Sequence, residues 1–285
     1  MPIPALTRYR LLALDVDGTL LDRDGRLRPG TSSAVERAAR AGIQPVLCTG
    51  RRYRRALPVA LELGLDVPIV CNSGALVKEP EGHRTLWRAD LEQTVLAELL
   101  ALLNRRGEPA VSMIDHGAEA PDFLVPARPV GRELFDEYVE RNGPYARVAP
   151  DWMERPADRL HFHLFAIGPR PEMLDLEALI LAELPGLVRT FVQRSPLYAG
   201  TMCEVLQRDA SKWSAVLHLA ELWGIAPEEI CAVGDDMNDI PMIAGAGLGV
   251  AMGHAPADVL AAADYVTEDH DNDGVAALIH GVLLK

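Results

Sequence analysis

Two carboxylates directly follow the first apolar segment of the sequence. Asp15 and Asp17 stand two residues apart in the segment DVDGT, which comes after a predicted strand at Tyr9–Leu14. Open α/β folds bind ligands at the carboxyl ends of strands, and Gly18 lets the chain turn sharply there. One carboxylate could attack a substrate while the other moves protons. Aspartates at strand ends also cap helices and form turns, so the pair indicates a catalytic site only together with other motifs.

A second acidic cluster follows the predicted strand Ile230–Val233. The segment GDDMND contains Asp235, Asp236, Asn238 and Asp239, which are four acidic or amide side chains within five residues. Carboxylates this close together repel each other unless a cation is present. Their hard oxygen atoms suit Mg²⁺. The cluster therefore favours a magnesium site over a simple helix cap.

A hydroxyl and free backbone amides follow another predicted strand, Val46–Cys48. Thr49, Gly50 and Arg51 come next, just before a predicted helix. The first amides of a helix bind phosphate oxygens. Thr49 could instead only cap the helix, and Arg51 begins an arginine-rich run that is typical of a solvated helix face. We therefore treat these three residues as candidate substrate contacts.

One of the three lysines in the chain, Lys212, lies at the beginning of a predicted helix, Ser211–Trp223. A cation there opposes the helix dipole. The position makes sense if the ammonium neutralises a phosphoryl group and an attacking carboxylate, although a solvated surface lysine is the simpler alternative.

The elements that must position these motifs alternate between strands and helices, the pattern of a parallel sheet. In the first eighty residues we predict strands at Tyr9–Leu14, Val46–Cys48 and Pro68–Cys71 and helices at Thr31–Ala41 and Arg52–Leu63, with Thr31 or Ser32 as a cap. The same alternation returns near the C-terminus, with predicted segments at Ser211–Trp223, Ile230–Val233, Met237–Ala244 and Leu248–Val250.

The middle of the chain has a different pattern, with loops rich in Pro and Arg. We predict helices at Leu91–Leu103 and Pro171–Leu184 and strands at Leu160–Ile167 and Leu187–Val192. The sequence therefore predicts an α/β fold, a doubly wound parallel sheet formed by residues 1–81 and 198–285. A separate α+β domain, residues 82–197, is inserted into it.

Composition excludes several classes of function. The 285 residues correspond to two domains at roughly 150 residues each. The 28 basic and 41 acidic residues give a net charge of −13, which argues against nucleic acid or an anionic membrane as the main partner. The longest apolar stretch, Ile240–Gly253, is broken by proline and glycine and is too short to span a membrane. The apolar run Leu11–Leu14 is too short for a signal peptide.

The four cysteines are widely separated and form no C-x-x-C pair, so neither a zinc site nor a disulfide framework is expected. We expect buried, reduced thiols and a cytoplasmic protein.

Taken in chain order, the four motifs resemble those of the haloacid dehalogenase superfamily of phosphotransferases: DxDGT, a Ser or Thr at a strand end, a lysine, and GDxxND. An insertion between the segment NSGA, residues 72–75, and Lys212 resembles the Cof-like branch, which has an α+β cap domain. The segment DNDGVA, residues 271–276, resembles the ending of that branch. Trp213 departs from the pattern, because relatives commonly have glycine after the motif lysine.

The resemblance implies a role for each motif residue. Asp15 would be the nucleophile that forms an aspartyl-phosphate, Asp17 the general acid and then base, and Lys212 the cation that offsets the negative charge. Mg²⁺ would be held by the Asp15 carboxylate, the Asp17 main-chain carbonyl and Asp235, with Asp239 ordering metal-bound water.

The substrate's phosphoryl group would be held by Thr49 and the Gly50 amide, with Asn238 also touching it and Arg51 as a further substrate-binding candidate. These roles predict a cytoplasmic, Mg²⁺-dependent phosphatase of small phosphorylated metabolites such as sugar phosphates. Two alternatives stay open from the sequence: a phosphomutase of sugar phosphates, and a non-catalytic protein that binds phosphorylated metabolites.

Overall fold

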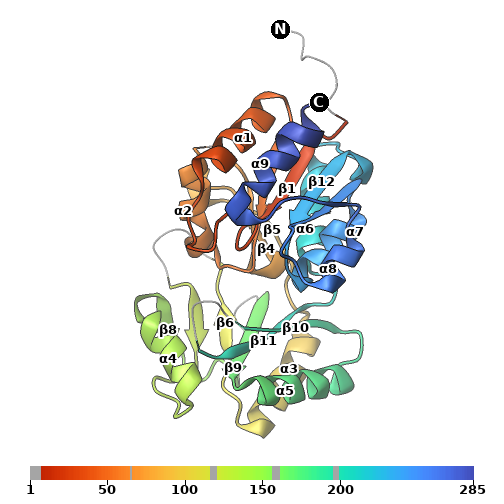
Figure 1. The fold of residues 1–285 in the computed structure, drawn as a ribbon. Coiled ribbons are helices and arrows are strands. Elements are labelled where there is room, and N and C mark those ends of the chain that lie inside the picture. The colour runs from red at the N-terminus through yellow and green to blue at the C-terminus, as the bar shows by residue number, and fades with distance from the viewer. Residues whose placement is uncertain (1–7, 65, 116–120, 156–160, 195–198) are drawn as a thin grey trace. The chain divides into compact units, whose positions relative to one another are not determined.

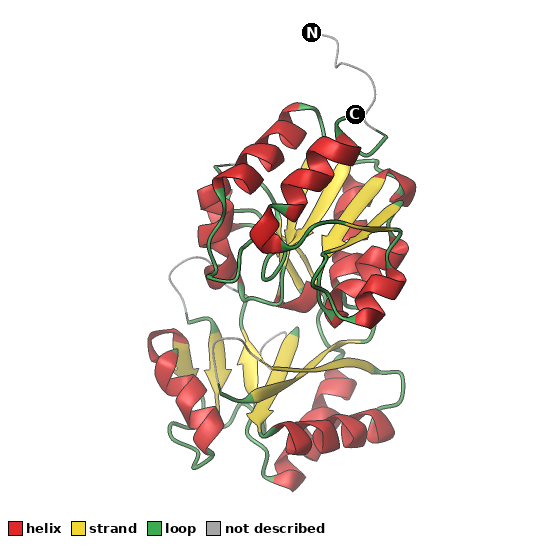
Figure 2. Cartoon of the chain, viewed as in Figure 1, coloured by secondary structure: helices red, strands yellow, loops and turns green. Residues whose placement is uncertain are grey.

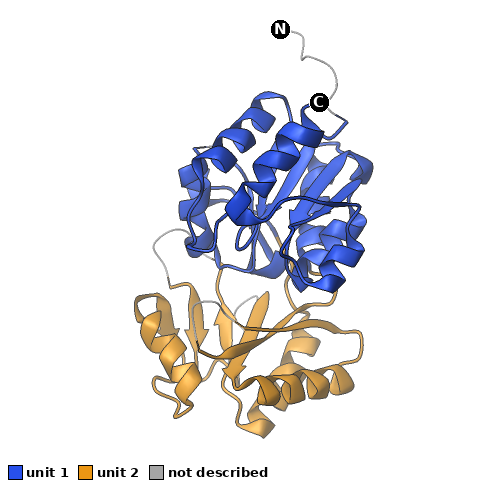
Figure 3. Ribbon diagram, viewed as in Figure 1, with its two compact units in different colours: residues 1–87, 211–285 blue, residues 88–210 orange. Residues whose placement is uncertain are grey.

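The chain folds into two compact units. The computed structural model describes residues 8–64, 66–115, 121–155, 161–194 and 199–285. Residues 1–87 and 211–285 form one unit, which we call the core unit, and residues 88–210 form the other, the inserted unit (Figure 3).

Both divisions lie further along the chain than the limits at 81/82 and 197/198 that the sequence predicts. Two strands account for the difference. Strand β5, Thr85–Arg88, lies at the edge of the core unit's sheet, and β11, Thr201–Gln207, lies within the inserted unit's sheet. The limits of the two units therefore depend on which sheet a strand joins, and local composition does not reveal that.

An eight-stranded sheet forms the centre of the core unit. Its strands from β14 to β3 are parallel, and β4 runs antiparallel to β3. Figure 1 shows segments from the two ends of the chain side by side in this sheet. In spatial order the strands are β14 (Tyr265–Val266), β13 (Leu248–Ala251), β12 (Ile230–Gly234), β1 (Leu11–Asp15), β2 (Gln44–Cys48), β3 (Ile69–Cys71), β4 (Leu76–Lys78) and β5.

Helices flank both faces of this sheet (Figure 2). One face packs in an apolar cluster that includes Leu11 and Ala13 of β1 together with Val216 and Leu219 of a helix. The strands in the middle of the sheet are covered on both sides, and for this reason they are continuous apolar runs. The helices are α1 (Pro29–Arg40), α2 (Tyr53–Leu63), α6 (Lys212–Leu222), α7 (Ile240–Gly245), α8 (Ala257–Ala262) and α9 (Gly274–Leu278).

The inserted unit contains a six-stranded sheet that is antiparallel except for the pair β7 and β8. The order of its strands is β10 (Val188–Arg194), β11, β9 (His163–Gly168), β6 (Val111–Met113), β7 (Phe123–Val125) and β8 (Ala146–Val148). Helices α3 (Gln93–Arg106) and α5 (Arg170–Glu183) contribute leucines to the apolar cluster on one face, while α4 (Glu133–Arg141) packs on β9.

The doubly wound α/β fold with an inserted α+β domain is therefore confirmed, but several local expectations are wrong. Neither Thr31 nor Ser32 caps α1, because that helix begins at Pro29 and has no side-chain cap. The predicted helix Met237–Ala244 is a 3₁₀ turn followed by α7. Leu160, the predicted start of a strand, lies outside the described residues. In the described part of the chain, no helix has the length and apolar character needed to cross a membrane.

Candidate active site

Strand order brings the two acidic motifs together. Asp15 is the last residue of β1, which pairs with β12 on one side and β2 on the other. The segment GDDMND begins at Gly234, the last residue of β12, and Thr49 follows the last residue of β2. Because these strands are parallel and adjacent, their carboxyl ends meet at one edge of the sheet.

Lys212 lies among the side chains of both acidic motifs. Its Nζ donates hydrogen bonds to Asp15 Oδ1 at 2.6 Å, to Asp239 Oδ1 at 2.6 Å and to Asn238 Oδ1 at 3.0 Å. The lysine side chain is only 2% exposed. The predicted alternative of a solvated surface lysine is therefore wrong.

The start of α6 fixes the position of this lysine. Ser211 is the N-cap, and its side chain accepts a hydrogen bond from the Ser214 amide while the Ser214 hydroxyl accepts one from the Ser211 amide. This capping box sets the first turn of the helix. Trp213 does not disturb that turn, because its indole packs against Gly245 at the end of α7.

Backbone and side-chain hydrogen bonds orient the carboxylates of the second motif. Asp239 Oδ2 accepts hydrogen bonds from the amides of Asp235 and Asp236, both at 3.0 Å. Asp235 Oδ1 accepts one from the Thr19 hydroxyl at 2.8 Å. Thr19, which sequence reasoning did not assign to the site, is the last residue of DVDGT, so the motif itself contained the signal.

Gly18 is required by a close approach. Its φ is +86°, and a Cβ built on it would lie 2.4 Å from Asp235 Oδ2. Any other residue would displace the carboxylate as well as strain the backbone. The glycine of the first motif therefore makes room for the second motif.

The cluster carries excess negative charge. Asp15, Asp235 and Asp239 each offer a carboxylate oxygen, and these oxygens lie within 4.8 Å of one another. Lys212 is the only cation in hydrogen-bond contact with them among the described residues. With all groups ionised, the cluster has two net negative charges.

Burial shapes the protonation of this cluster. Desolvation raises the pKa of Asp15 well above its usual value, and repulsion from Asp239 and Asp235 adds to this, while Lys212 opposes it. Desolvation followed by repulsion from Asp239 raises the pKa of Asp235 to about 7. Burial disfavours the charged form of Lys212, but attraction to Asp15 and Asp239 outweighs this and raises its pKa.

The donor set fits a magnesium ion. Asp15 Oδ2 is buried and has no hydrogen-bond partner among the described residues. An orphaned buried carboxylate oxygen is costly, and a divalent cation bound by it would remove that cost. Three carboxylates with two uncompensated charges are the hard oxygen donors that Mg²⁺ prefers.

Asp17 lies apart from this cluster, with its carboxylate half-exposed. Arg51 Nε donates to Asp17 Oδ2 at 2.7 Å, and Arg51 Nη2 donates to Asp17 Oδ1 at 2.5 Å. Such a two-point pair fixes the orientation of a carboxylate. Arg51 therefore contacts Asp17 rather than forming part of a purely solvated face, a pairing that the sequence spacing did not reveal.

Thr49 is buried beside this pair and does not cap a helix. Its hydroxyl accepts a hydrogen bond from the Arg51 amide at 3.0 Å, whereas the N-cap of α2 is Arg52. Gly50, which lies between Thr49 and Arg51 in the chain, is half-buried.

One further residue near the site has no sequence signal. His254 Nε2 lies 3.7 Å from Asp235 Oδ2, and the ring also bonds to the backbone of Gly18. Desolvation followed by the neighbouring His270 lowers the pKa of His254. Nothing in its spacing along the chain marks it as a neighbour of the first motif.

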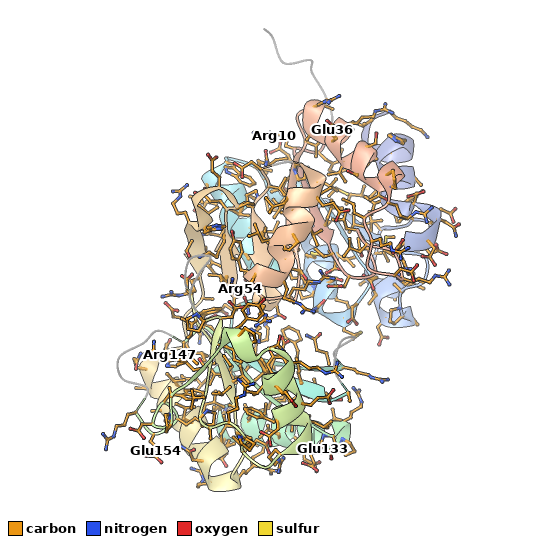
Figure 4. The ribbon with its side chains drawn as sticks, turned by 90° about the vertical axis from the view of Figure 1, so that its left-hand side faces the viewer. Arg10, Glu36, Arg54, Glu133, Arg147 and Glu154 are labelled. Carbon is orange, nitrogen blue, oxygen red and sulfur yellow. The ribbon has the colours of Figure 1, made fainter. Side chains whose placement is uncertain are left out.

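A pocket of about 540 Å³ lies elsewhere, at the amino-terminal ends of the strands. Arg10, Gln44 and Trp223 are among its lining residues, and none of the predicted site residues is. Figure 4 shows Arg10 at the opposite end of the core unit from Arg54, which belongs to α2. The charged groups Arg10 and Arg84 in this pocket are paired with Glu229 and Glu79.

The fold and the convergent strand ends place the chain in the class of open α/β enzymes that bind ligands at the carboxyl edge of a parallel sheet. Residues 12–279 match the haloacid dehalogenase-like hydrolase family, and the chain belongs to that family.

Relatives and a solved structure cover nearly the whole chain. Pyridoxal phosphate phosphatase YbhA of Escherichia coli (strain K12) is 30% identical over 96% of this chain and 99% of its own length. An HMP-PP phosphatase of Serratia proteamaculans (strain 568) is 29% identical over 87% of this chain and 85% of its own. A haloacid dehalogenase-like hydrolase from B. subtilis is 26% identical with a TM-score of 0.76, covering 96% of this chain and all of its own. The chain is a phosphatase of this superfamily, a phosphoric monoester hydrolase.

Proposed function

We propose that the protein is a Mg²⁺-dependent phosphatase that hydrolyses small phosphorylated metabolites through an aspartyl-phosphate on Asp15. The observation that carries the proposal is the state of the Asp15 carboxylate. Lys212 holds Oδ1, while Oδ2 is buried without a hydrogen-bond partner among the described residues. A carboxylate that is fixed at one oxygen, with its other oxygen free of protein hydrogen bonds, can both bind a metal ion and attack a phosphorus atom.

Magnesium would be held by the carboxylates of Asp15 and Asp235 and the main-chain carbonyl of Asp17, with Asp239 ordering bound water. When bound, the ion would offset the charge of the phosphoryl group. The cluster of three carboxylates with one lysine supports this assignment, since its charge is not balanced within the protein.

In the first step, an oxygen of Asp15 bonds to phosphorus as the bond between phosphorus and the ester oxygen breaks. Asp17 gives its proton to the leaving alcohol. In the second step Asp17 takes a proton from water, whose oxygen bonds to phosphorus as the Asp15–phosphorus bond breaks, and inorganic phosphate leaves. In the structure both oxygens of Asp17 accept hydrogen bonds from Arg51, so one of these bonds has to open before Asp17 can give a proton to the leaving alcohol.

Thr49, the Gly50 amide and Asn238 would contact the phosphoryl oxygens, and Arg51 would be a further substrate contact. Lys212 already links Asn238 to Asp15, which supports a shared site for the nucleophile and the phosphate. Phosphoryl transfer depends mainly on such positioning and charge compensation.

The proposed substrates are small monoesters of the sugar phosphate type. The related proteins support the class, because their names specify small phosphorylated compounds, pyridoxal phosphate in one and HMP-PP in the other. All four cysteines are buried as thiols, which supports a reducing compartment such as the cytoplasm.

The test is phosphate release from 4-nitrophenyl phosphate with and without Mg²⁺. Asp15→Asn should lower kcat by at least about 10⁴-fold, because the amide cannot form the phosphoenzyme. Asp175→Asn, the same change at an exposed residue of α5, serves as the control.

Asp17→Asn should block formation of the phosphoenzyme or let the phosphoenzyme accumulate, as measured by acid quenching. Retained activity of Asp15→Asn, or wild-type turnover that ignores Mg²⁺, would overturn the proposal.

A further inference from the structure

A buried left-handed turn connects two parts of the site. Asn72, Ser73 and Gly74 have φ values of +52°, +55° and +97° in succession. All three are buried. The two non-glycine residues are strained in this region of backbone conformation, and such strain persists only where the surroundings impose it.

On one side, this turn is bonded to the loop that carries the proposed phosphate contacts. The Asn72 amide donates to the Arg51 carbonyl at 2.9 Å, and the Ser73 amide donates to the Thr49 carbonyl at 3.2 Å. The turn therefore sets the path of the backbone between Thr49 and Arg51.

On the other side, the turn touches the start of α6. A Cβ built on Gly74 would lie 2.1 Å from the Ser211 carbonyl carbon, 2.2 Å from its oxygen and 2.4 Å from the Lys212 nitrogen. These are backbone atoms in a capped first helical turn, so they cannot swing aside as a flexible side chain would. Gly74 is the residue through which the turn sets the position of Lys212.

We propose that the turn Asn72–Gly74 is a positioning element that holds the Lys212 ammonium in register with Asp15 and the Thr49–Arg51 loop. Gly74 is a positioning residue and acts through Lys212. The inference rests on the proposed function, because it assigns this turn a part in phosphoryl transfer. This role explains why the strained backbone is kept. The left-handed path lets the backbone of Gly74 pack directly against the backbone of Ser211 and Lys212, with no side chain between them.

The experiment starts from Gly74→Ala. The methyl group must displace Ser211 and Lys212, which lengthens the 2.6 Å contacts of Nζ with Asp15 and Asp239. We expect kcat for 4-nitrophenyl phosphate to fall about 10²-fold, the cost of a shift of about 1 Å at a catalytic group. Gly42→Ala is the matched control, since Gly42 has φ +92° but nothing within 4 Å of its Cβ. It should keep kcat within about twofold.

A double-mutant cycle separates positioning from general damage. In a Lys212→Met background, Gly74→Ala should lower kcat by less than about threefold, because the group it displaces is already absent. Effects that multiply would overturn the inference. The rate of Asp15→Asn defines the background rate. If the proposed function is wrong, Asp15→Asn keeps its activity. If only this inference is wrong, Asp15→Asn is inactive but the double-mutant cycle shows no coupling between Gly74 and Lys212.

A milder variant covers the case in which Gly74→Ala does not fold. Ser73→Gly accepts φ +55° without strain but loosens the turn. Its kcat should fall about threefold to tenfold in the wild-type background and stay unchanged in the Lys212→Met background. Equal losses in both backgrounds, or no loss in either, would overturn the inference.

Discussion

The two units bury polar groups in different ways. In the core unit, the carboxylates of Asp15 and Asp239 contact the same ammonium group, and Asp235 adds a third negative charge nearby. In the inserted unit, Glu204 accepts a hydrogen bond from Gln193 at 2.9 Å and lies 3.6 Å from His163. Burial lowers the pKa of His163, although Glu204 opposes this, so the ring is neutral at neutral pH.

The difference shows what distinguishes a reactive cluster from a structural one. Around Glu204 the inserted unit combines a carboxylate with neutral partners, and its second buried histidine, His161, is bonded to the Ser112 hydroxyl at 2.6 Å. The core unit instead concentrates like charges from several chain segments around one ammonium group. Uncompensated charge in a buried place destabilises the fold. It serves a function only when a bound cation neutralises it and a substrate binds beside it.

Among the substitutions that compare the two clusters, the largest effect is expected from removing the cation of the core cluster. Lys212→Met leaves three carboxylates without their ammonium partner, so kcat should fall about 10²–10³-fold. The metal-free protein should also lose about 3–5 kcal/mol of unfolding free energy. Phosphate release and chemical denaturation measure the two effects, with Lys285→Met as the control. A loss below tenfold would show that the lysine does not distinguish this cluster from the one in the inserted unit.

A matched pair of substitutions compares the two clusters directly. Asp239→Asn weakens the attraction for Lys212 and places an amide where Oδ2 now accepts two backbone hydrogen bonds, so kcat should fall about 10²-fold. Glu204→Gln is the same chemical change in the inserted unit. Its new carbonyl can still accept from Gln193, so kcat should stay within about twofold. Steady-state kinetics with 4-nitrophenyl phosphate measures both values of kcat. Equal losses of kcat in the two variants would show that the two clusters do not differ in their part in catalysis.

The smallest effect concerns another buried carboxylate of the inserted unit, Glu108. Burial raises its pKa, although Arg132 opposes this at 3.0 Å. Because the folded state holds this proton more tightly, the stabilisation is fully present below the unfolded pKa of about 4.3 and is lost as pH rises through the folded pKa.

Glu108→Gln isolates this contribution. The unfolding free energy of the wild type relative to the variant should decrease as pH rises from about 4.3 through the raised pKa, as measured by denaturant titrations. Glu140→Gln, the same change at an exposed residue of α4, is the control. A difference that stays level or increases with pH would contradict the assigned direction.

Much of the site could be predicted from the sequence, because its motifs are local. Asp15 and the segment GDDMND each follow an apolar run, and a strand end is a local property that composition reveals. The alternation of strands and helices likewise predicted a parallel sheet. The order of the motifs along the chain then suggested the family, which the match over residues 12–279 confirms.

Only the tertiary structure decided which of these groups touch. Lys212 and Asp15 are 197 positions apart, and their contact depends on the order of strands β12, β1 and β2 together with the capped start of α6. Local patterns do not encode such order. The Arg51–Asp17 pair and the fit of Gly74 against Ser211 depend on distances of a few ångströms between separate segments, which packing of the whole core unit determines.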